Sequence, residues 1–456
     1  MPLFSKVLVA NRAAVASRVL RALNTLRIPS LAVYSDADRG APWLELASET
    51  AHIGASPARE SYLNQATILE AARRARCDAL HPGYGFLSEN AGFARAVEEA
   101  GMRFIGPAPR WIEAMGHKTR AREIAAAEGL PVGPGSAVLP PERERVLAAA
   151  EEIGYPILVK PAAGGGGIGM LPARTPDELL VAVERAASMA ERGFANSEVY
   201  LERLVEQPRH VEIQLFGDRH GRVAHLFERD CSVQRRHQKI IEEACAPNVD
   251  RVAMDALLER AASTMQHLGY DNLGTMEMLL GADGEFRFLE MNTRLQVEHG
   301  VTEEVTGIDL VVSQLRSSAG ERLDAILPQA ISVRGHAIQA RVYAEDPKRF
   351  LPSPGTLREF SPPQRIDGIR VETGYAAGRE VTPHYDPLLA KVIAHATSRS
   401  EAIDKLIAAL QVFRIEGVKH NVPALIPILD SDEFRGGQVH TGLAAKIVAR
   451  SVAKAA

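Results

Sequence analysis

In the first hundred positions, short apolar runs alternate with apolar residues at helical spacing. Residues 6–11 and 30–34 read as buried strands, and between them apolar positions recur every three or four residues. Later short strands are expected at 79–81 and 103–105. This alternation predicts a parallel sheet with helices on both faces. The glycine-rich turn at 81–85 falls where strand ends would face a ligand crevice.

From about residue 115 the pattern changes. A helix over 120–128 ends at Gly129, and 156–160 reads as a strand that leads into a glycine run. Residues 175–178 have the N-cap, N1 proline and capping-box acid of a helix start. We expect 133–205 to form a small module between two larger units. Further expected elements are strands across 209–292 with one long helix near 251–268, strands at 337–342 and 389–394, and helices near 400–413 and 422–428.

A polar run follows the predicted strand that ends near Met291. In an extended segment alternate side chains share a face, which would align Glu290, Asn292, Arg294, Gln296 and Glu298. Such a face suits an anionic reaction, although a solvated edge strand would show the same polarity.

Residues 274–280 and 285–291 flank Gly-Ala-Asp-Gly and read as a hairpin. Glu277 and Glu290 would then face one another on one side of the pair. Two carboxylates so close suit Mg²⁺ or Mn²⁺ between them, and Asn292 nearby favours this interpretation. The alternative is an exposed acidic pair balanced by lysines.

The glycine run 164–169 formally matches G-x-G-x-x-G, but a dinucleotide fingerprint needs a helix to begin inside it, and here another strand follows. A glycine loop between two strands favours a flap whose amides close over phosphates, with Lys160 on the strand before it. A glycine loop without ligand remains the alternative. Residues 199–204 could contact adenine and ribose, or be an ordinary strand.

Two further features read alone as structural. The basic stretch 228–239 is compatible with an exposed turn, and Cys231 within it with a buried small side chain. Arg341, on a predicted strand, would by itself be a surface ion pair.

Composition narrows the class of protein. The chain has 456 residues, 46% hydrophobic and 24% charged, with a net charge of −4, which predicts two or three globular units and no general nucleic-acid or membrane surface. Three cysteines without a CxxC pair suit a reducing compartment. Neither a signal peptide nor an apolar run of about 20 residues is apparent, so we expect a soluble, cytoplasmic protein.

Long motifs lie in a fixed order along the chain, within about residues 6–446. They are Ala-Asn-Arg (10–12), His-Pro-Gly-Tyr-Gly-Phe-Leu-Ser-Glu-Asn (81–90), Arg-His-Val-Glu (209–212), the segments 228–239 and 290–299, Arg-Gly-His (334–336) and Ala-Glu-Asp-Pro (344–347). Together they resemble the biotin carboxylase family of the ATP-grasp superfamily. The resemblance implies an α/β fold with a Rossmann-like pre-ATP-grasp N-terminal domain (1–115), an ATP-grasp domain (116–330) with a mobile lid (about 133–205), a mixed α+β C-terminal domain (331–446) and a tail (447–456).

The resemblance also implies a role for each matching residue. ATP would be bound by Lys118, Lys160, Gly165, Gly166, Gly167, Glu202, Leu204, His210, Gln234 and His237. Two Mg²⁺ or Mn²⁺ ions would be held by Glu277, Glu290 and Asn292. Bicarbonate and biotin would be held by Lys239, Arg294, Gln296, Val297, Glu298 and Arg341, of which Lys239, Arg294, Glu298 and Arg341 would act in catalysis.

In the family's mechanism Glu298 would deprotonate bicarbonate, whose attack on ATP gives carboxyphosphate; this decomposes to CO₂ and phosphate, and Arg341 stabilises the biotin anion that captures CO₂. The chain has no Met-Lys dipeptide, so biotin is expected on a separate biotin carboxyl carrier protein, with a separate carboxyltransferase. The family also implies a homodimer. The final acceptor is open: an acyl-CoA is favoured, and urea or guanidine is an alternative.

Five positions depart from the family's usual pattern. Ala13 and Ala14 replace Gly-Glu, His117 replaces Asp, Ile168 replaces Arg and Gly300 replaces Pro. We expect Gly300 to loosen the loop beyond Glu298. The Gly-Ile-Gly loop and Gly300 look closer to urea- or guanidine-carboxylase domains. Another ATP-grasp ligase and a degenerate nucleotide-binding subunit stay open as alternatives, but no residue assigned to chemistry is lost.

Overall fold

The N-terminal part of the chain forms a five-stranded parallel sheet in the order β3-β2-β1-β4-β5. The computed structural model describes residues 3–163, 167, 169–194, 196–363 and 366–455. The elements of this part are β1 (Val7–Val9), α1 (Ala13–Thr25), β2 (Ser30–Tyr34), β3 (Glu49–His52), α2 (Gln65–Arg74), β4 (Ala79–His81), α3 (Ala91–Glu99), β5 (Arg103–Phe104) and α4 (Pro109–Gly116), with short 3₁₀ helices at Asp36–Asp38, Pro42–Leu46 and Ala58–Glu60.

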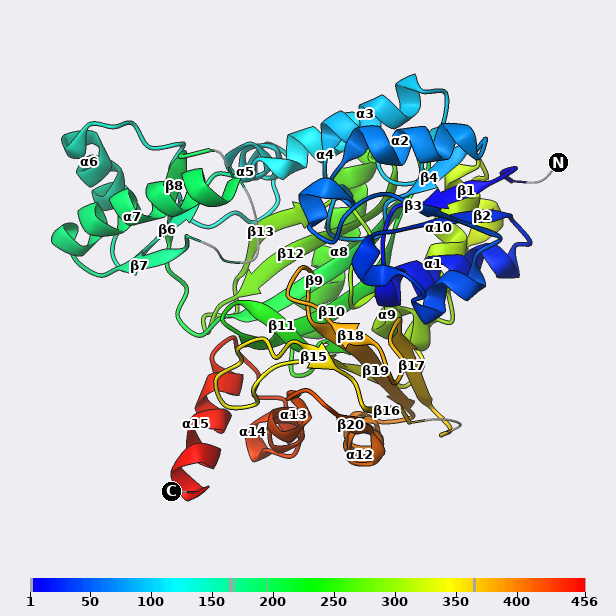
Figure 1. The fold of residues 1–456 in the computed structure, drawn as a ribbon. Coiled ribbons are helices and arrows are strands. Elements are labelled where there is room, and N and C mark those ends of the chain that lie inside the picture. Colours follow the sequence, from blue (N-terminus) through cyan, green and yellow to red (C-terminus); the bar gives the residue numbers. More distant parts are fainter. Residues whose placement is uncertain (1–2, 164–166, 168, 195, 364–365, 456) are drawn as a thin grey trace.

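Helices cover both faces of this sheet (Figure 1). The side chains of β1 show why, because successive residues of a strand point to opposite faces. Val7 and Val9 pack in one cluster with residues of α1, whereas Leu8 packs with residues of α2 and α3. The parallel sheet predicted from the alternation is therefore confirmed.

A small module with its own apolar core follows, joined through α5 (Lys118–Ala127). It projects at the left of Figure 1 and contains an antiparallel sheet in the order β7-β6-β8. Thr175 Oγ1 accepts a hydrogen bond from Glu178 N at 3.3 Å, which confirms the predicted helix start. The elements are α6 (Arg143–Ile153), β6 (Ile157–Pro161), β7 (Leu171–Ala173), α7 (Pro176–Phe194) and β8 (Val199–Arg203).

An eight-stranded antiparallel sheet forms the centre of the molecule, in the order β13-β12-β9-β10-β11-β14-β19-β17. The pairing of β11 with β14 joins strands from before and after residue 330 into one continuous sheet. Its strands are β9 (Arg209–Gly217), β10 (Val223–Arg235), β11 (Gln238–Ala244), β12 (Asn272–Leu280), β13 (Phe286–Asn292), β14 (His336–Tyr343), β17 (Ile369–Thr373) and β19 (Leu388–Ala396).

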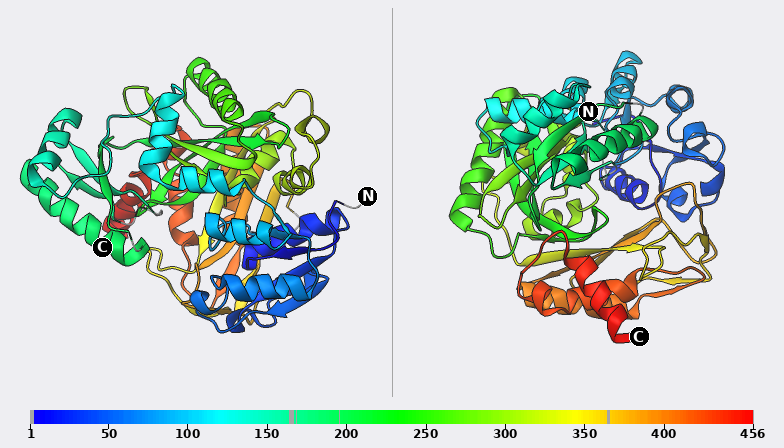
Figure 2. Two further views of the ribbon diagram at one scale, coloured as in Figure 1. Left: turned by 90° about the horizontal axis from the view of Figure 1, so that it is seen from above. Right: turned by 90° about the vertical axis from the view of Figure 1, so that its left-hand side faces the viewer.

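Helices pack around this sheet, and the last four lie along its lower side in Figure 1 and in the right-hand view of Figure 2, away from the N-terminal sheet. The long helix predicted near 251–268 is α8. The helices are α8 (Arg251–Leu268), α9 (His299–Thr306), α10 (Leu310–Ser318), α11 (Leu323–Ile326), α12 (Arg399–Val412), α13 (Val422–Leu429), α14 (Asp432–Arg435) and α15 (Leu443–Ala455). Two short strand pairs complete the fold: β15 (Gly355–Thr356) with β18 (Glu380–Val381), and β16 (Glu359–Ser361) with β20 (Arg414–Glu416).

The extended face predicted over 290–298 is wrong beyond Asn292, where β13 ends. β13 is an edge strand, and the next backbone amide, Thr293 N, donates instead to Glu89 Oε1 of the N-terminal part at 3.1 Å. The chain then bends toward α9.

The expectation that Gly300 loosens the loop beyond Glu298 is also wrong. Gly300 lies in the first turn of α9 and is buried. A Cβ at this position would lie 2.4 Å from Ile393 Cδ1, so the glycine permits close packing against β19.

Among the described residues, none of the helices combines the length and the apolarity that a bilayer crossing demands.

Candidate active site

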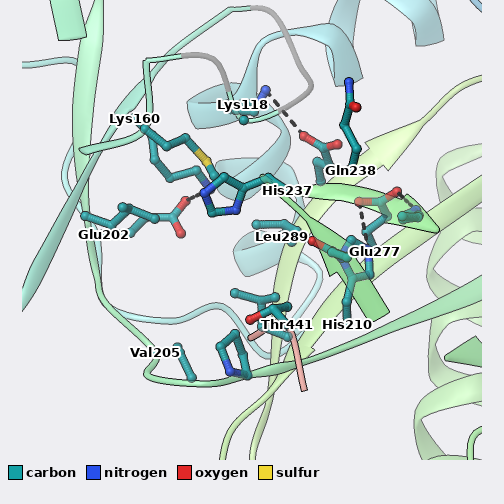
Figure 3. Close-up of a pocket in the computed structure, with 18 of the residues that line it drawn as sticks. Lys118, Lys160, Glu202, Val205, His210, His237, Gln238, Glu277, Leu289 and Thr441 are labelled. Atoms are coloured by element: carbon teal, nitrogen blue, oxygen red, sulfur yellow. Dashed lines mark hydrogen bonds and ion pairs between the residues drawn. The ribbon is translucent and has the colours of Figure 1, made fainter. Parts of the chain in front are cut away.

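One cleft of about 1000 Å³ opens between the small module and the eight-stranded sheet, and Figure 3 shows part of its lining. Every candidate residue that the structure describes lines it, whereas Gly165 and Gly166 lie outside the described residues. The candidates in the lining are Lys118, Lys160, Gly167, Glu202, Leu204, His210, Gln234, His237, Lys239, Glu277, Glu290, Asn292, Arg294, Gln296, Val297, Glu298 and Arg341.

Glu298 lies on the floor of the cleft and is fully buried. Lys239 Nζ donates to its Oε1 at 2.9 Å, and Arg341 Nη2 donates to its Oε2 at 3.0 Å. Burial and the charge of Glu212 both oppose ionisation, but Lys239 and Arg341 outweigh them and hold the pKa of Glu298 below its ordinary value. A carboxylate that is ionised at neutral pH and oriented by two cations can accept a proton.

Lys239 lies among three buried carboxylates. Besides Glu298, its Nζ donates to Glu212 Oε2 at 2.6 Å and to Glu277 Oε1 at 2.7 Å. Burial alone would lower the pKa of this ammonium, but the carboxylates raise it well above the usual value. Lys239 therefore stays charged at neutral pH, which suits it to hold an anion.

Arg341 is not a surface residue. Its Nε donates to Glu242 and its Nη2 to Glu298, and only 8% of the residue is exposed. Its interpretation as a surface ion pair is wrong because β14 is an internal strand, flanked by β11 and β19.

Glu277 and Glu290 are direct partners in the register of β12 and β13, as the hairpin predicts. His210 Nε2 lies 3.0 Å from Glu277 Oε2, and Lys118 Nζ lies 3.3 Å from Glu290 Oε2. Asn292 Nδ2 donates to Glu277 Oε1 at 2.9 Å. The two carboxylates and the amide oxygen of Asn292 are donors of the kind that hard divalent cations prefer.

The guanidinium of Arg294 is fixed by three side-chain acceptors and by the carbonyl oxygen of Leu295, which accepts from Nη1 at 3.3 Å. Its Nε donates to Glu89 Oε2 at 2.7 Å, its Nη1 to Gln296 Oε1 at 2.9 Å and its Nη2 to Asn292 Oδ1 at 2.8 Å. A cation held in this way presents a preformed site for an anion at the cleft wall.

The small module contributes a charged pair of its own to the cleft, Lys160 with Glu202. Lys160 Nζ donates to Glu202 Oε1 at 2.9 Å (Figure 3), and Tyr200 Oη donates to the same oxygen at 2.7 Å. Burial opposes the ionisation of Glu202, but Lys160 and Arg122 outweigh it and lower its pKa.

The β10–β11 turn brings His237 against Gly167 of the module. A Cβ on Gly167, whose φ is +74°, would lie 2.7 Å from His237 Cβ, so this approach requires glycine. Nearby, Gln234 Nε2 lies 3.1 Å from His210 Nδ1, on the ring edge opposite the Nε2 atom that lies near Glu277. Within the stretch 228–239 the exposed-turn interpretation fits only residues around Arg236, since Arg229 is fully buried.

Comparisons with known proteins agree with this geometry. Three family models match in order along the chain: "Biotin carboxylase, N-terminal domain" at residues 3–112, "Carbamoyl-phosphate synthase L chain, ATP binding domain" at 117–326 and "Biotin carboxylase C-terminal domain" at 339–446. A biotin carboxylase of Halalkalibacterium halodurans is 47% identical over 439 residues, which cover 96% of this chain and 97% of that protein. The chain belongs to the biotin carboxylase family.

Other relatives within the biotin carboxylase family include longer chains. The α subunit of methylcrotonoyl-CoA carboxylase from Oryza sativa is 46% identical over 438 residues, which cover 96% of this chain and 59% of that subunit. The solved biotin carboxylase domain of 2-oxoglutarate carboxylase from Hydrogenobacter thermophilus, a dimer in complex with MgADP, ADP and bicarbonate, superposes with a TM-score of 0.94 at 41% identity, with 98% of each chain covered.

The departures from the biotin carboxylase pattern have different surroundings. Ala13 has a φ of +51°, a conformation that favours glycine, and Ala14 beside it is buried. His117 separates α4 from α5, and its Nε2 lies 3.3 Å from Glu198 Oε2. Ile168 lies outside the described residues.

Sequence reasoning missed the carboxylates that hold the candidate cations in place. Glu212 accepts from Lys239 and from Arg229, Glu242 accepts from Arg341, and Glu89 accepts from Arg294. Glu212 and Glu89 lie inside the quoted motifs, which is the one signal in the sequence that could have marked them.

Proposed function

We propose that this chain catalyses the ATP- and bicarbonate-dependent carboxylation of biotin on a separate carrier protein, via carboxyphosphate. This is the first half-reaction of a biotin-dependent carboxylase. The observation that carries the proposal is the Glu298 carboxylate, held between Lys239 and Arg341 on the floor of a cleft that also gathers the nucleotide candidates. The Hydrogenobacter domain, in complex with MgADP and bicarbonate, supports the assignment of both ligands to this chain.

The nucleotide is proposed to bind between the small module and the sheet. Lys118 and Lys160 would offset phosphate charge, and Glu202 would contact the ribose end. The module would act as the lid, with the glycine run over the phosphates. The full proposed set is Lys118, Lys160, Gly165, Gly166, Gly167, Glu202, Leu204, His210, Gln234 and His237.

Glu277, Glu290 and Asn292 are proposed to hold two Mg²⁺ or Mn²⁺ ions. The fit rests on the donor chemistry, since the two carboxylates are direct cross-strand partners and the amide oxygen follows on the same strand. When bound, such ions would supply neutralisation of the phosphate charge.

Bicarbonate is proposed to bind beside Arg294, Lys239, Gln296 and Val297. Glu298 would accept the bicarbonate proton, because its carboxylate is ionised at neutral pH and therefore free to take one. Arg294 and Lys239 would hold the resulting negative charge while it attacks the γ-phosphate. Arg341 would then stabilise the biotin anion that captures CO₂.

The proposed partners are a biotin carboxyl carrier protein, a carboxyltransferase and a second copy of this chain, in the cytoplasm. The Hydrogenobacter domain is described as a dimer, which supports the homodimer. An acyl-CoA is the favoured final acceptor, and methylcrotonoyl-CoA carboxylase among the relatives supports that class. We propose the domain boundaries 1–115, 116–330 and 331–446, with the lid at about 133–205 and the tail at 447–456.

The first test is ADP release by the purified chain with MgATP and bicarbonate, with and without free biotin, alongside Glu298→Gln. Biotin-stimulated turnover that collapses in the variant is expected, because the amide cannot take the proton. Turnover indifferent to biotin would favour another ATP-grasp ligase. Nucleotide binding without any turnover would favour a degenerate subunit.

A further inference from the structure

Beneath residues 296–298, three neighbouring strands present a row of charged side chains. Arg341 on β14, Lys391 on β19 and Glu372 on β17 are cross-strand partners, so they point to the same face of the sheet. All three are buried. Arg341 holds the side chain of Glu298, and Lys391 reaches the backbone carbonyl of the residue before it.

Lys391 has no exposed surface and does not line the cleft. Its Nζ donates to the carbonyl oxygen of Val297 at 2.8 Å and lies 2.5 Å from Glu372 Oε2. An ammonium is costly to bury unless it is paired, and Glu372 provides the counter-charge. The neighbouring carbonyl, Gln296 O, is held by His299 Nδ1 at 2.8 Å.

The carboxylates around this lysine do not form a free cation site. His299, Glu303 and Glu372 come within ligand distance of one another. Cations of the chain already compensate them, since Glu303 pairs with Arg18 at 2.9 Å and with Arg370 at 2.7 Å, and Glu372 pairs with Lys391. The cluster therefore serves to place the Lys391 ammonium.

We propose that Lys391 is a positioning residue for this reaction: through the Val297 carbonyl it fixes the backbone that presents the Glu298 carboxylate to bicarbonate. The inference rests on the proposed role of Glu298 as the base. Proton transfer requires the base within hydrogen-bond reach, so a displaced 297–298 peptide slows chemistry. The nucleotide candidates on the other walls are unaffected.

The test variant is Lys391→Met/Glu372→Gln, which removes the ammonium together with its counter-charge. With MgATP, bicarbonate and biotin, kcat is expected to fall by about tenfold to a hundredfold while KM for ATP changes by less than about twofold. In the Glu298→Gln background the same pair of changes should cause no further loss, because its effect runs through Glu298. A purely structural role would not give this split or this non-additivity.

Arg399→Met/Glu243→Gln is the matched control. It removes another ion pair, at 2.6 Å, between the partly buried Arg399 and the buried Glu243. Glu243 follows Glu242 on β11, so its side chain points to the opposite face of the sheet. Its kcat should stay at the wild-type value.

Two outcomes would overturn this inference but not the proposed function. One is a wild-type kcat in Lys391→Met/Glu372→Gln, and the other is a loss of kcat that multiplies with the loss caused by Glu298→Gln. Wild-type turnover that ignores biotin and bicarbonate would overturn the proposed function and the inference with it. If nucleotide binding shows that the double variant is unfolded, Lys391→Arg replaces it. Arginine keeps Glu372 neutralised but moves the donor, so the same loss and non-additivity are expected.

Discussion

Among single residues, Glu298 shows most directly how neighbours decide chemistry. Its burial would keep the carboxyl neutral, yet two donors, Lys239 and Arg341, hold it ionised. Glu212 and Glu242 in turn hold those two cations. The ionised state of the candidate base therefore depends on two cations, and the position of each cation depends in turn on a further carboxylate.

Replacement of Lys239 by methionine should move the acid limb of the pH–rate profile. A base with a lowered pKa loses activity only as the pH falls through that lowered value. Without Lys239 the pKa of Glu298 rises, so kcat/KM should begin to fall at a higher pH than in the wild type. Lys419→Met is the control, because the side chain of Lys419 is 67% exposed and pairs only with Asp346 in the described structure. An acid limb that stays in place would contradict this account of the pKa of Glu298.

The sequence identified the residues that face the cleft but not those behind them. Lys239, Arg294 and Glu298 lie in motifs, and all three line the cleft. Glu242 could not be found in the same way, because most of β11 is buried on both faces and no alternation of polar and apolar positions marks it. Its role depends on contact with a strand almost a hundred residues away.

Ala13→Gly should stabilise the protein. Ala13 has a φ of +51°, where a Cβ is strained, and glycine relieves that strain. The free energy of unfolding should rise by about 1 kcal/mol, less the greater chain entropy of glycine in the unfolded state. Urea unfolding measures the change, with Ala16→Gly, inside α1, as a control that should destabilise. An Ala13→Gly variant less stable than wild type would refute the strain argument.

At the scale of elements, α9 and β19 hold in place the segment that carries Glu298. The sequence placed β12, β13 and β19 closely, since their apolar residues and turns are local signals. It extended β13 too far because the partner of Thr293 N is Glu89, a non-local contact. The sequence also predicted wrongly that Gly300 would loosen the loop beyond Glu298. The reason is that Ile393, which fills the space beside Gly300, is distant in sequence.

Gly300→Pro should destabilise the protein through packing. Proline is tolerated in the first turn of a helix, so the backbone alone predicts little cost. Its Cβ would meet Ile393 Cδ1, which lies 2.4 Å from that position, and overpacking of this kind costs about 1–3 kcal/mol.

Ile393→Val removes the Cδ1 atom and provides the rescue. Proline in the Ile393→Val background should cost less than in the wild type, by about 1 kcal/mol or more. Chemical unfolding of the four proteins in this cycle measures the coupling. If the effects of Gly300→Pro and Ile393→Val are additive, the cost of the proline comes from the backbone of α9 and not from the contact with Ile393.

At the scale of the whole molecule, three parts of the chain meet at one buried arginine. Arg18 belongs to α1 of the N-terminal part, and its Nη2 lies 2.9 Å from Glu303 Oε1 of α9 and 2.5 Å from Asp309 Oδ1. Its Nε lies 3.7 Å from Glu372 Oε1 on β17. The alternation of strands and helices predicted the N-terminal sheet, but no local pattern could predict this junction, because Arg18 lies almost 300 residues or more from each of its partners.

Arg18→Met should therefore weaken the association of all three parts. Removal of one member of a buried charge network leaves its partners buried without a counter-charge, at a cost of about 3–5 kcal/mol in the free energy of unfolding. Arg74→Met, which breaks an exposed pair with Glu70, should cost less than about 1 kcal/mol. Urea unfolding at neutral pH measures both.

The deficit of Arg18→Met should narrow as the pH falls. Burial opposes the ionisation of Glu372, but Lys391, Arg370 and Arg18 together hold its pKa well below the usual value. A carboxylate with a lowered pKa stabilises the folded state above its unfolded pKa, and this contribution is lost as the pH falls through the lowered folded-state pKa. Lys391 and Arg370 remain in the variant, so the deficit should begin to narrow only below about pH 4. A deficit that is equal at neutral and acid pH would mean that Arg18 acts through packing of its side chain rather than through its charge.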